Sequence, residues 1–152
     1  MSSRRVIINT MFYTTEPIRF ECTQCGRCCS GGGDYHVFLS AKEAERIREL
    51  LQLSVDWFKR RYLQKLDSGE LTVRLNADGR CSFLDAAGQC SVYAARPTQC
   101  RTYPFWPELL RSKSAWRAEA ARCEGIERGA TVPLAQVRAA LTAQRAYEAG
   151  IE

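Results

Sequence analysis

Apolar side chains recur at helical intervals in the segment that follows Ser40. Ala44, Ile47 and Leu51 are spaced three or four residues apart, with charged residues between them. Ser40 and Glu43 have the spacing of a capping box, in which each side chain accepts a hydrogen bond from the other residue's backbone N–H. We therefore predict an amphipathic helix that begins after Ser40 and ends near Leu51.

Two further helices are predicted from the same kind of spacing. Ser54 is the expected N-cap of the first, which ends at the turn residues Asp67–Gly69 and has an apolar face made of Val55, Phe58, Tyr62 and Leu66. The second begins near Thr131 and extends to about residue 148. Its apolar positions are Leu134, Val137, Leu141 and Tyr147.

The region between these helices has strand and turn patterns. Leu71–Leu75 alternates between apolar and polar residues, which is typical of a strand. The turns Asn76–Gly79 and Asp85–Gly88 then frame two short segments, Cys81–Leu84 and Cys90–Tyr93, which predict a small hairpin with a cysteine on each side. Asp85 is expected to cap its turn.

These elements together predict the fold class. The segment 96–107 contains three prolines and three aromatic residues, so we expect it to be irregular but packed. We predict an α+β protein: a small, helix-rich single domain over 1–152, with a short β-hairpin and cysteine-bearing loops organised around one or more metal sites.

Composition narrows the location and the partner class. With 45% hydrophobic and 26% charged residues, the chain is neither disordered nor membranous in character, and no apolar run approaches a spanning length. The run Val6–Ile8 is too short for a signal peptide, so we expect a cytoplasmic protein with no membrane association. The net charge of +5 raises the question of nucleic acid as a partner.

Eight cysteines against a single histidine are the main chemical feature of the sequence. Four of them, Cys22, Cys25, Cys28 and Cys29, lie within eight residues at spacings that let thiolates converge on a metal. Cys29, adjacent to Cys28, is a candidate ligand for a second metal or a bridge. The other four candidate ligands are Cys81, Cys90, Cys100 and Cys123. Metal ligation is favoured over disulfides for two reasons. The sequence shows no secretory signal, and a chain of this length can form a hydrophobic core without disulfide cross-links.

The cysteine blocks resemble a known family. Phe20-x-Cys22-x-x-Cys25-Gly-x-Cys28-Cys29 is similar to the signature of the CxxCxxCC, or YkgJ-like, cysteine-cluster proteins, which are described as zinc- or iron-chelating. The blocks around Cys81, Cys90 and Arg96-Pro97-x-x-Cys100-Arg101 follow in the family's order. The resemblance implies a family-like core over about residues 20–125. A glutamate, Glu124, stands where the family often has proline, which sets Cys123 apart from the other candidates.

The cofactor is expected to be iron, as a possible iron–sulfur cluster, or zinc, with a slight preference for iron. Thiolates around a metal carry negative charge, which nearby guanidinium groups would offset. Five arginines lie in or beside the cysteine blocks: Arg27, Arg80, Arg96, Arg101 and Arg122. Ordinary solvated surface is the equal alternative for Arg80 and Arg122, whereas Arg96 and Arg101 lie inside the family-like block and are the stronger candidates. Much of the positive charge is then explained as counter-charge, which makes nucleic acid the least favoured partner. An unidentified protein partner remains compatible with the sequence.

Other residues are weaker candidates. His36, the only histidine, is expected to be a surface or packing residue rather than a metal ligand, and the three tryptophans are expected to pack in the core or in loops. The sequence contains no catalytic constellation. The leading hypothesis is a metal-binding protein with one or two Cys-ligated centres and a redox, metal-handling or partner-support role. The alternatives are a metalloenzyme or accessory module for protein side-chain modification, and a zinc-stabilised nucleic-acid binder.

Overall fold

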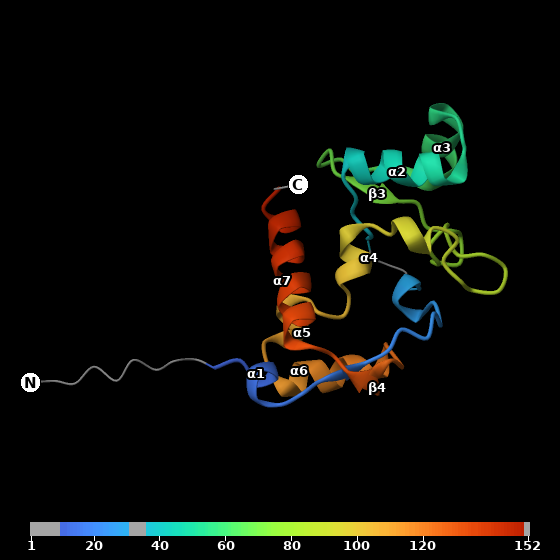
Figure 1. The fold of residues 1–152 in the computed structure, drawn as a ribbon. Coiled ribbons are helices and arrows are strands. Elements are labelled where there is room, and N and C mark those ends of the chain that lie inside the picture. Colours follow the sequence, from blue (N-terminus) through green and yellow to red (C-terminus); the bar gives the residue numbers. More distant parts are fainter. Residues whose placement is uncertain (1–9, 31–35, 151–152) are drawn as a thin grey trace, which may run out of the picture.

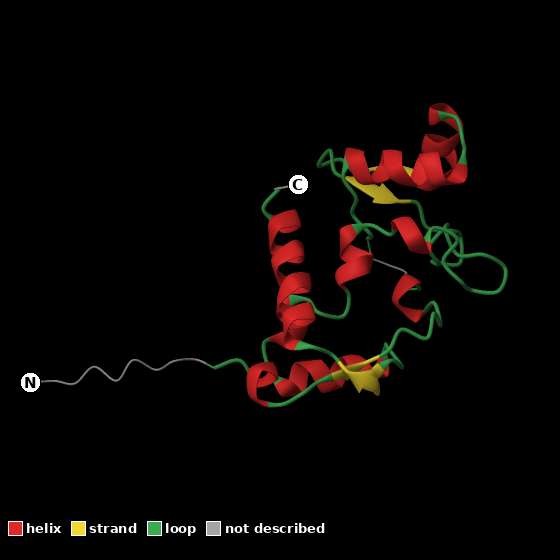
Figure 2. Cartoon of the chain, viewed as in Figure 1, coloured by secondary structure: helices red, strands yellow, loops and turns green. Residues whose placement is uncertain are grey.

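The computed structural model describes residues 10–30 and 36–150, so the run Val6–Ile8 lies outside the described residues. Short helices and two two-stranded antiparallel sheets make up the fold, as Figures 1 and 2 show. The α+β prediction is therefore confirmed. The elements follow in the order α1 Phe12–Thr15, β1 Arg19–Phe20, η1 Arg27–Cys29, α2 Ala41–Leu51, α3 Val55–Tyr62, β2 Leu63–Lys65, β3 Leu71–Val73, η2 Tyr93–Ala95, α4 Thr98–Thr102, α5 Pro107–Leu110, α6 Lys113–Ala118, η3 Glu119–Ala121, β4 Ile126–Thr131 and α7 Leu134–Glu148.

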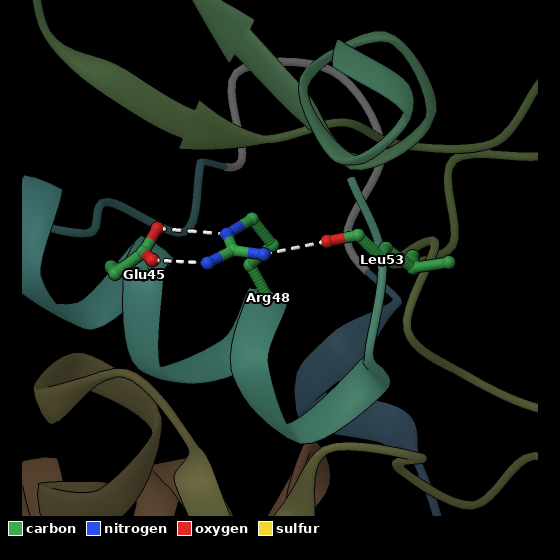
Figure 3. A network of polar contacts seen from close by, with 3 residues as sticks. All are labelled: Glu45, Arg48 and Leu53. Carbon is green, nitrogen blue, oxygen red and sulfur yellow. Dashed lines mark hydrogen bonds and ion pairs between the residues drawn. The ribbon is translucent and has the colours of Figure 1, made fainter. Parts of the chain in front are cut away.

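Helix α2 begins where the sequence predicts. The Ser40 side chain accepts a hydrogen bond from the Glu43 N–H at 3.1 Å, and the Glu43 carboxylate accepts one from the Ser40 N–H at 3.0 Å. At the other end, the Arg48 guanidinium pairs with Glu45 and donates to the carbonyl of Leu53 at 2.7 Å, as shown in Figure 3. Arg48 thereby fixes the turn that leads from α2 into α3.

The prediction that the next helix continues to Leu66 is wrong. Ser54 caps α3 as expected, but the helix ends at Tyr62, and Leu63–Lys65 forms β2 against β3. In β2 the backbone N–H and C=O groups of Leu63–Lys65 form hydrogen bonds with β3 instead of hydrogen bonds within a longer helix. Tertiary contacts therefore override the helical pattern of the sequence. The expectation that all three tryptophans pack is also wrong for Trp57, which is 53% exposed.

The cysteine-bearing hairpin is shorter than a pair of strands. Leu84 and Cys90 form an isolated antiparallel bridge, and the Phe83 carbonyl accepts a hydrogen bond from the Ser91 N–H at 2.8 Å. Asp85 caps the turn as predicted, because its carboxylate accepts hydrogen bonds from the Ala87 and Gln89 N–H groups at 2.9 Å. The two-stranded hairpin sheet of this protein is β2–β3 instead.

The segment 96–107 contains a helix, α4, that the sequence pattern does not reveal. Glu43 holds the start of α4, since its carboxylate accepts hydrogen bonds from the N–H and hydroxyl of Thr98 at 2.7 and 2.5 Å. The other end contacts α7, where the Thr102 hydroxyl donates to Gln144 at 2.7 Å. Figure 1 shows α4 between α7 and the layer of α2 and β3. Its position depends on residues that are distant in the sequence.

Helix α7 confirms the predicted C-terminal helix but begins at Leu134, after Pro133, rather than near Thr131. Thr131 is instead the last residue of β4. The β1–β4 sheet, which joins the start of the chain to the segment before α7, is not predicted by the sequence pattern. Helices α1, α5 and α6 are likewise absent from the prediction, because each is too short to give a clear helical period.

Buried residues form two hydrophobic clusters. The first contains Ile47, Phe58, Val73 and Phe83, and the second contains Trp116, Leu110, Val137 and Leu141. Within the described residues, none of the helices has the length and apolar character needed to cross a bilayer. Four cysteines belong to or pack against the first cluster and Cys123 packs against the second, so the candidate site depends on how the clusters meet.

Candidate metal centre

All eight cysteines line one cavity of about 250 Å³. Four come from the segment 22–29, two from the hairpin at 81–90, one from α4 and one from the turn before β4. Apolar and aromatic side chains complete the wall, among them Phe83, Leu84, Val92 and Phe105. The fold therefore brings together every candidate ligand that the sequence singles out, although they span about a hundred residues of chain.

Close backbone contacts place the first cysteine segment against the hairpin. Gly26 has a φ of +77°, and a Cβ atom at this position would lie 2.7 Å from the carbonyl oxygen of Gly88. The Cys81 N–H donates to the Cys29 carbonyl at 2.8 Å. Glycine is therefore required at position 26 both by backbone conformation and by space.

The same segment is attached to the Cys123 region on its other side. The Glu21 N–H donates to the Gly125 carbonyl at 3.1 Å, and the Thr23 hydroxyl donates to the Glu124 carboxylate at 2.5 Å. Glu124 thus has a direct structural contact. These bonds place Cys123 on the cavity wall despite its distance in sequence from the other cysteines.

Burial separates the thiols into an inner and an outer part of the cavity. Cys22 and Cys25 are exposed, Cys81 is 5% exposed, and the remaining five are half-buried. Cys81 belongs to the first hydrophobic cluster, and Cys29, Cys90 and Cys100 pack against it, whereas Cys123 packs against the second cluster. All eight cysteines are free thiols.

Electrostatic coupling identifies four thiols that lie close together. Burial raises the pKa of Cys81 to about 11 and also raises the pKa values of Cys90 and Cys100. Each of these three pKa values is raised further by a neighbouring thiolate on Cys28, and Cys100 is also affected by Cys81 and Cys90. Cys28 also raises the pKa of Cys123, as does Cys25. We define the inner set as Cys28 with the three hairpin and α4 thiols, Cys81, Cys90 and Cys100, because Cys100 is affected by both Cys81 and Cys90 as well as by Cys28.

Cys28 also contacts its neighbour in sequence. Its Sγ lies 3.9 Å from Sγ of Cys29, and the hydrogen bond between them, together with burial, raises the pKa of the Cys28 thiol. Thiols with raised pKa values stay protonated at neutral pH unless a metal displaces the proton. The inner thiols therefore suit a tightly bound thiophilic metal better than a role as free nucleophiles.

The donor set fits zinc or iron, because both are held in proteins by cysteine thiolates. Among the described His, Cys, Asp and Glu residues, no group of three or more has the arrangement needed to hold a metal ion. The thiols surround the cavity without having converged on a common point. Metal binding at this site would therefore require the thiol groups to move closer together.

Three of the five predicted counter-charges have positions that fit that role. Arg96 and Arg101 line the cavity, and the charge of Arg96 lowers the pKa values of Cys90 and Cys100 against the effect of burial. Arg122 has the same lowering effect on Cys28. Arg27 and Arg80 are not among the residues that line the cavity.

Tyr93 is a feature of the site to which the sequence analysis gave no role. Burial and a hydrogen bond with Cys22 raise the pKa of the Tyr93 hydroxyl. The Arg96 guanidinium lies 3.7 Å from the centre of the Tyr93 ring and donates to the Tyr93 carbonyl at 3.0 Å. Tyr93 thus connects an exposed thiol to a cationic residue of the cavity, a contact that no local sequence signal reveals.

The remaining candidates have structural positions. His36 is not a wall residue of the cysteine cavity, and its carbonyl accepts a hydrogen bond from the Gln99 side chain at 2.9 Å. Trp116 is fully buried and donates to the Glu127 carboxylate at 2.7 Å. Trp106 donates from its ring nitrogen to the Gln99 carbonyl at 3.1 Å. These contacts support the expectation that His36, Trp106 and Trp116 pack.

The fold and the site define a small α+β protein whose cysteines are gathered around one internal cavity. The chain belongs to the CxxCxxCC family, described as "Putative zinc- or iron-chelating domain", whose family model matches residues 21–124. The matched region includes all eight cysteines and ends before β4 and α7. No solved structure matches the chain.

Proposed function

We propose that this protein holds a thiolate-ligated metal centre in the cysteine cavity, with Cys28, Cys81, Cys90 and Cys100 as its inner ligands. The observation that carries the proposal is that all eight cysteines line one cavity. The electrostatic effects of Cys28, Cys81, Cys90 and Cys100 on one another support the choice of these four as inner ligands. Membership of a zinc- or iron-chelating family supports the same function. The other four thiols, Cys22, Cys25, Cys29 and Cys123, make up a second set that could hold a second ion or shield the first.

Iron is the favoured metal in this proposal, with zinc as the competing outcome. The cavity has room for more than one metal ion, and its wall is rich in aromatic and aliphatic side chains. Apolar surroundings shield an iron–sulfur cluster from solvent and influence its reduction potential. The expected role is redox chemistry, metal handling or support of a partner protein. Eight free thiols suit the reducing cytoplasm, where the protein is proposed to act.

Metal analysis on anaerobically purified protein tests the proposal most directly. We expect bound iron and visible absorbance that bleaches on reduction with dithionite. If the protein instead contains stoichiometric zinc and has no visible absorbance, the proposed thiolate centre stands, but the assignment of iron and of a redox role is rejected. Protein that binds neither metal, even after anaerobic reconstitution, would reject the proposed centre.

Serine substitutions test which thiols are the inner ligands. Cys81→Ser and Cys100→Ser should each reduce metal content to near background, because a four-thiolate site tolerates the loss of a ligand poorly. Cys22→Ser, at an exposed position, is the matched control and should retain at least half of the metal. Equal losses in all three variants, with far-UV circular dichroism unchanged, would contradict the division into inner and outer sets.

A further inference from the structure

A second cavity, of about 690 Å³, is lined by residues of α4, α5 and α7, by the turn that joins β2 to β3, and by the segment 38–40 that precedes α2. It shares no wall residue with the cysteine cavity. Part of its wall comes from α7, which lies beyond the residues that match the family model. The cavity is therefore a separate feature of this chain, and its chemistry can be considered on its own.

The side chains of this second cavity are acidic and aromatic. Three carboxylates and three rings contribute to its wall: Glu70, Glu108, Glu148, Phe38, Trp106 and Tyr147. Among the described residues, no lysine or arginine lines it, although the chain has 22 such residues against 17 acidic ones. None of the three carboxylates forms an ion pair with another residue in the part of the chain that the structure describes. The cavity is thus a locally negative site in a positively charged protein.

Hydrogen bonds hold two parts of this wall in place. The Trp106 ring nitrogen donates to the Gln99 carbonyl and the Thr102 hydroxyl, both at 3.1 Å. Gln144, which is 6% exposed, accepts from the Thr102 hydroxyl and donates to the Glu148 carboxylate at 3.0 Å. One aromatic ring and one carboxylate are therefore already oriented before any ligand binds, which lowers the entropic cost of binding.

We propose that this second cavity binds an arginine side chain presented by a partner protein. A guanidinium group can pair with carboxylates through several N–H donors and can also lie against an aromatic face. The wall offers both kinds of contact, and its described residues include no cation that would compete. Lysine carries the same charge, but its compact ammonium lacks the planar surface that suits stacking. The expected occupant is therefore an arginine-containing segment rather than any basic segment.

Binding of labelled peptides to the full-length protein tests this site. An arginine–glycine repeat peptide should bind more tightly, by fluorescence anisotropy, than the lysine version, and a version with neutral citrulline should bind weakest. The double variant Glu108→Gln/Glu148→Gln keeps the shape of both side chains and should weaken arginine-peptide binding by about tenfold or more. Glu49→Gln, an exposed glutamate on α2 outside this cavity, is the matched control and should leave binding unchanged.

Several outcomes would overturn the proposal. Equal affinity of the double variant and the Glu49→Gln control would show that the peptide binds elsewhere. Equal affinity for the arginine and lysine peptides would reject recognition of the guanidinium group. If the double variant instead abolished self-association of the protein without peptide, the occupant would be a second copy of this chain. The metal content of the double variant is measured in parallel. Metal content equal to that of the wild type shows that a loss of peptide binding does not come from damage to the cysteine cavity.

Discussion

Single residues determine how closely the cysteine segment can approach the hairpin. Gly26 follows Cys25 directly, and the carbonyl of Gly88 occupies the space that a side chain at position 26 would need. The sequence alone indicates a turn at Cys25-Gly26, since glycine tolerates a positive φ. It does not reveal the second reason for glycine at this position, because Gly88 is distant in the chain.

We predict that Gly26→Ala destabilises the protein by about 1–3 kcal/mol more than Gly69→Ala does. Both glycines have a positive φ, but a Cβ at Gly69 meets no other atom within 4 Å, so only the backbone cost applies there. Urea unfolding of the two variants and the wild type measures the difference. Equal losses of free energy would show that the contact between Gly26 and Gly88 is not a close one in solution.

At the scale of elements, the pairing of α2 with α4 connects the predicted helix to the site. Glu43 belongs to the capping box of α2, yet the same carboxylate accepts both hydrogen bonds from Thr98 at the start of α4. Because Cys100 lies on α4, a helix cap that does not itself line the cavity helps to position one of the proposed ligands. The capping box can be found in the sequence, but its second set of partners cannot.

Two substitutions separate these roles of the α2 N-terminus. Ser40→Ala removes one cap bond and should cost about 1 kcal/mol with metal content unchanged. Glu43→Ala leaves the buried Thr98 donors without an acceptor, so it should cost about 3 kcal/mol or more and lower the metal bound per folded chain. Unfolding curves and metal analysis on the folded fraction provide the comparison. Full metal content in Glu43→Ala would argue that α4 keeps its position without this carboxylate.

At the scale of the whole molecule, the two hydrophobic clusters meet around the cysteine cavity. Cys81, Cys90 and Cys100 belong to or pack against one cluster, and Cys123 packs against the other. The stability of the metal-free protein should therefore depend on the protonation of these thiols. Cys81 gives the clearest expectation, because burial raises its pKa from 9.0 to about 11.

The free energy of unfolding of the metal-free protein should fall as the pH rises from about 9 to 11. In this interval the unfolded chain has lost the Cys81 proton while the folded chain retains it, so the unfolded state binds fewer protons and is favoured by rising pH. The contribution of Cys81 to this fall is about 2–3 kcal/mol. Urea unfolding in chelator and reductant measures it, and Cys81→Ala should show a smaller fall. An unchanged slope in this variant would assign the effect to other groups.

The sequence by itself determined the features that depend on neighbouring residues. The capping box of α2, the Ser54 cap, the Asp85 turn and the apolar face of α7 all follow from spacings of a few residues, and the structure has each of them. The cysteine signature likewise indicated the family, because it is a local pattern with a fixed spacing.

Only the tertiary structure decided how these parts come together. The change from helix to strand at Leu63, the position of α4 and the β1–β4 sheet depend on partners far away in the chain. The gathering of eight thiols around one cavity depends on the same long-range contacts, which a reading of local spacing cannot supply. The physical reason is that local propensities are weak, so the burial of apolar surface and the pairing of distant backbone groups decide between the alternatives they allow.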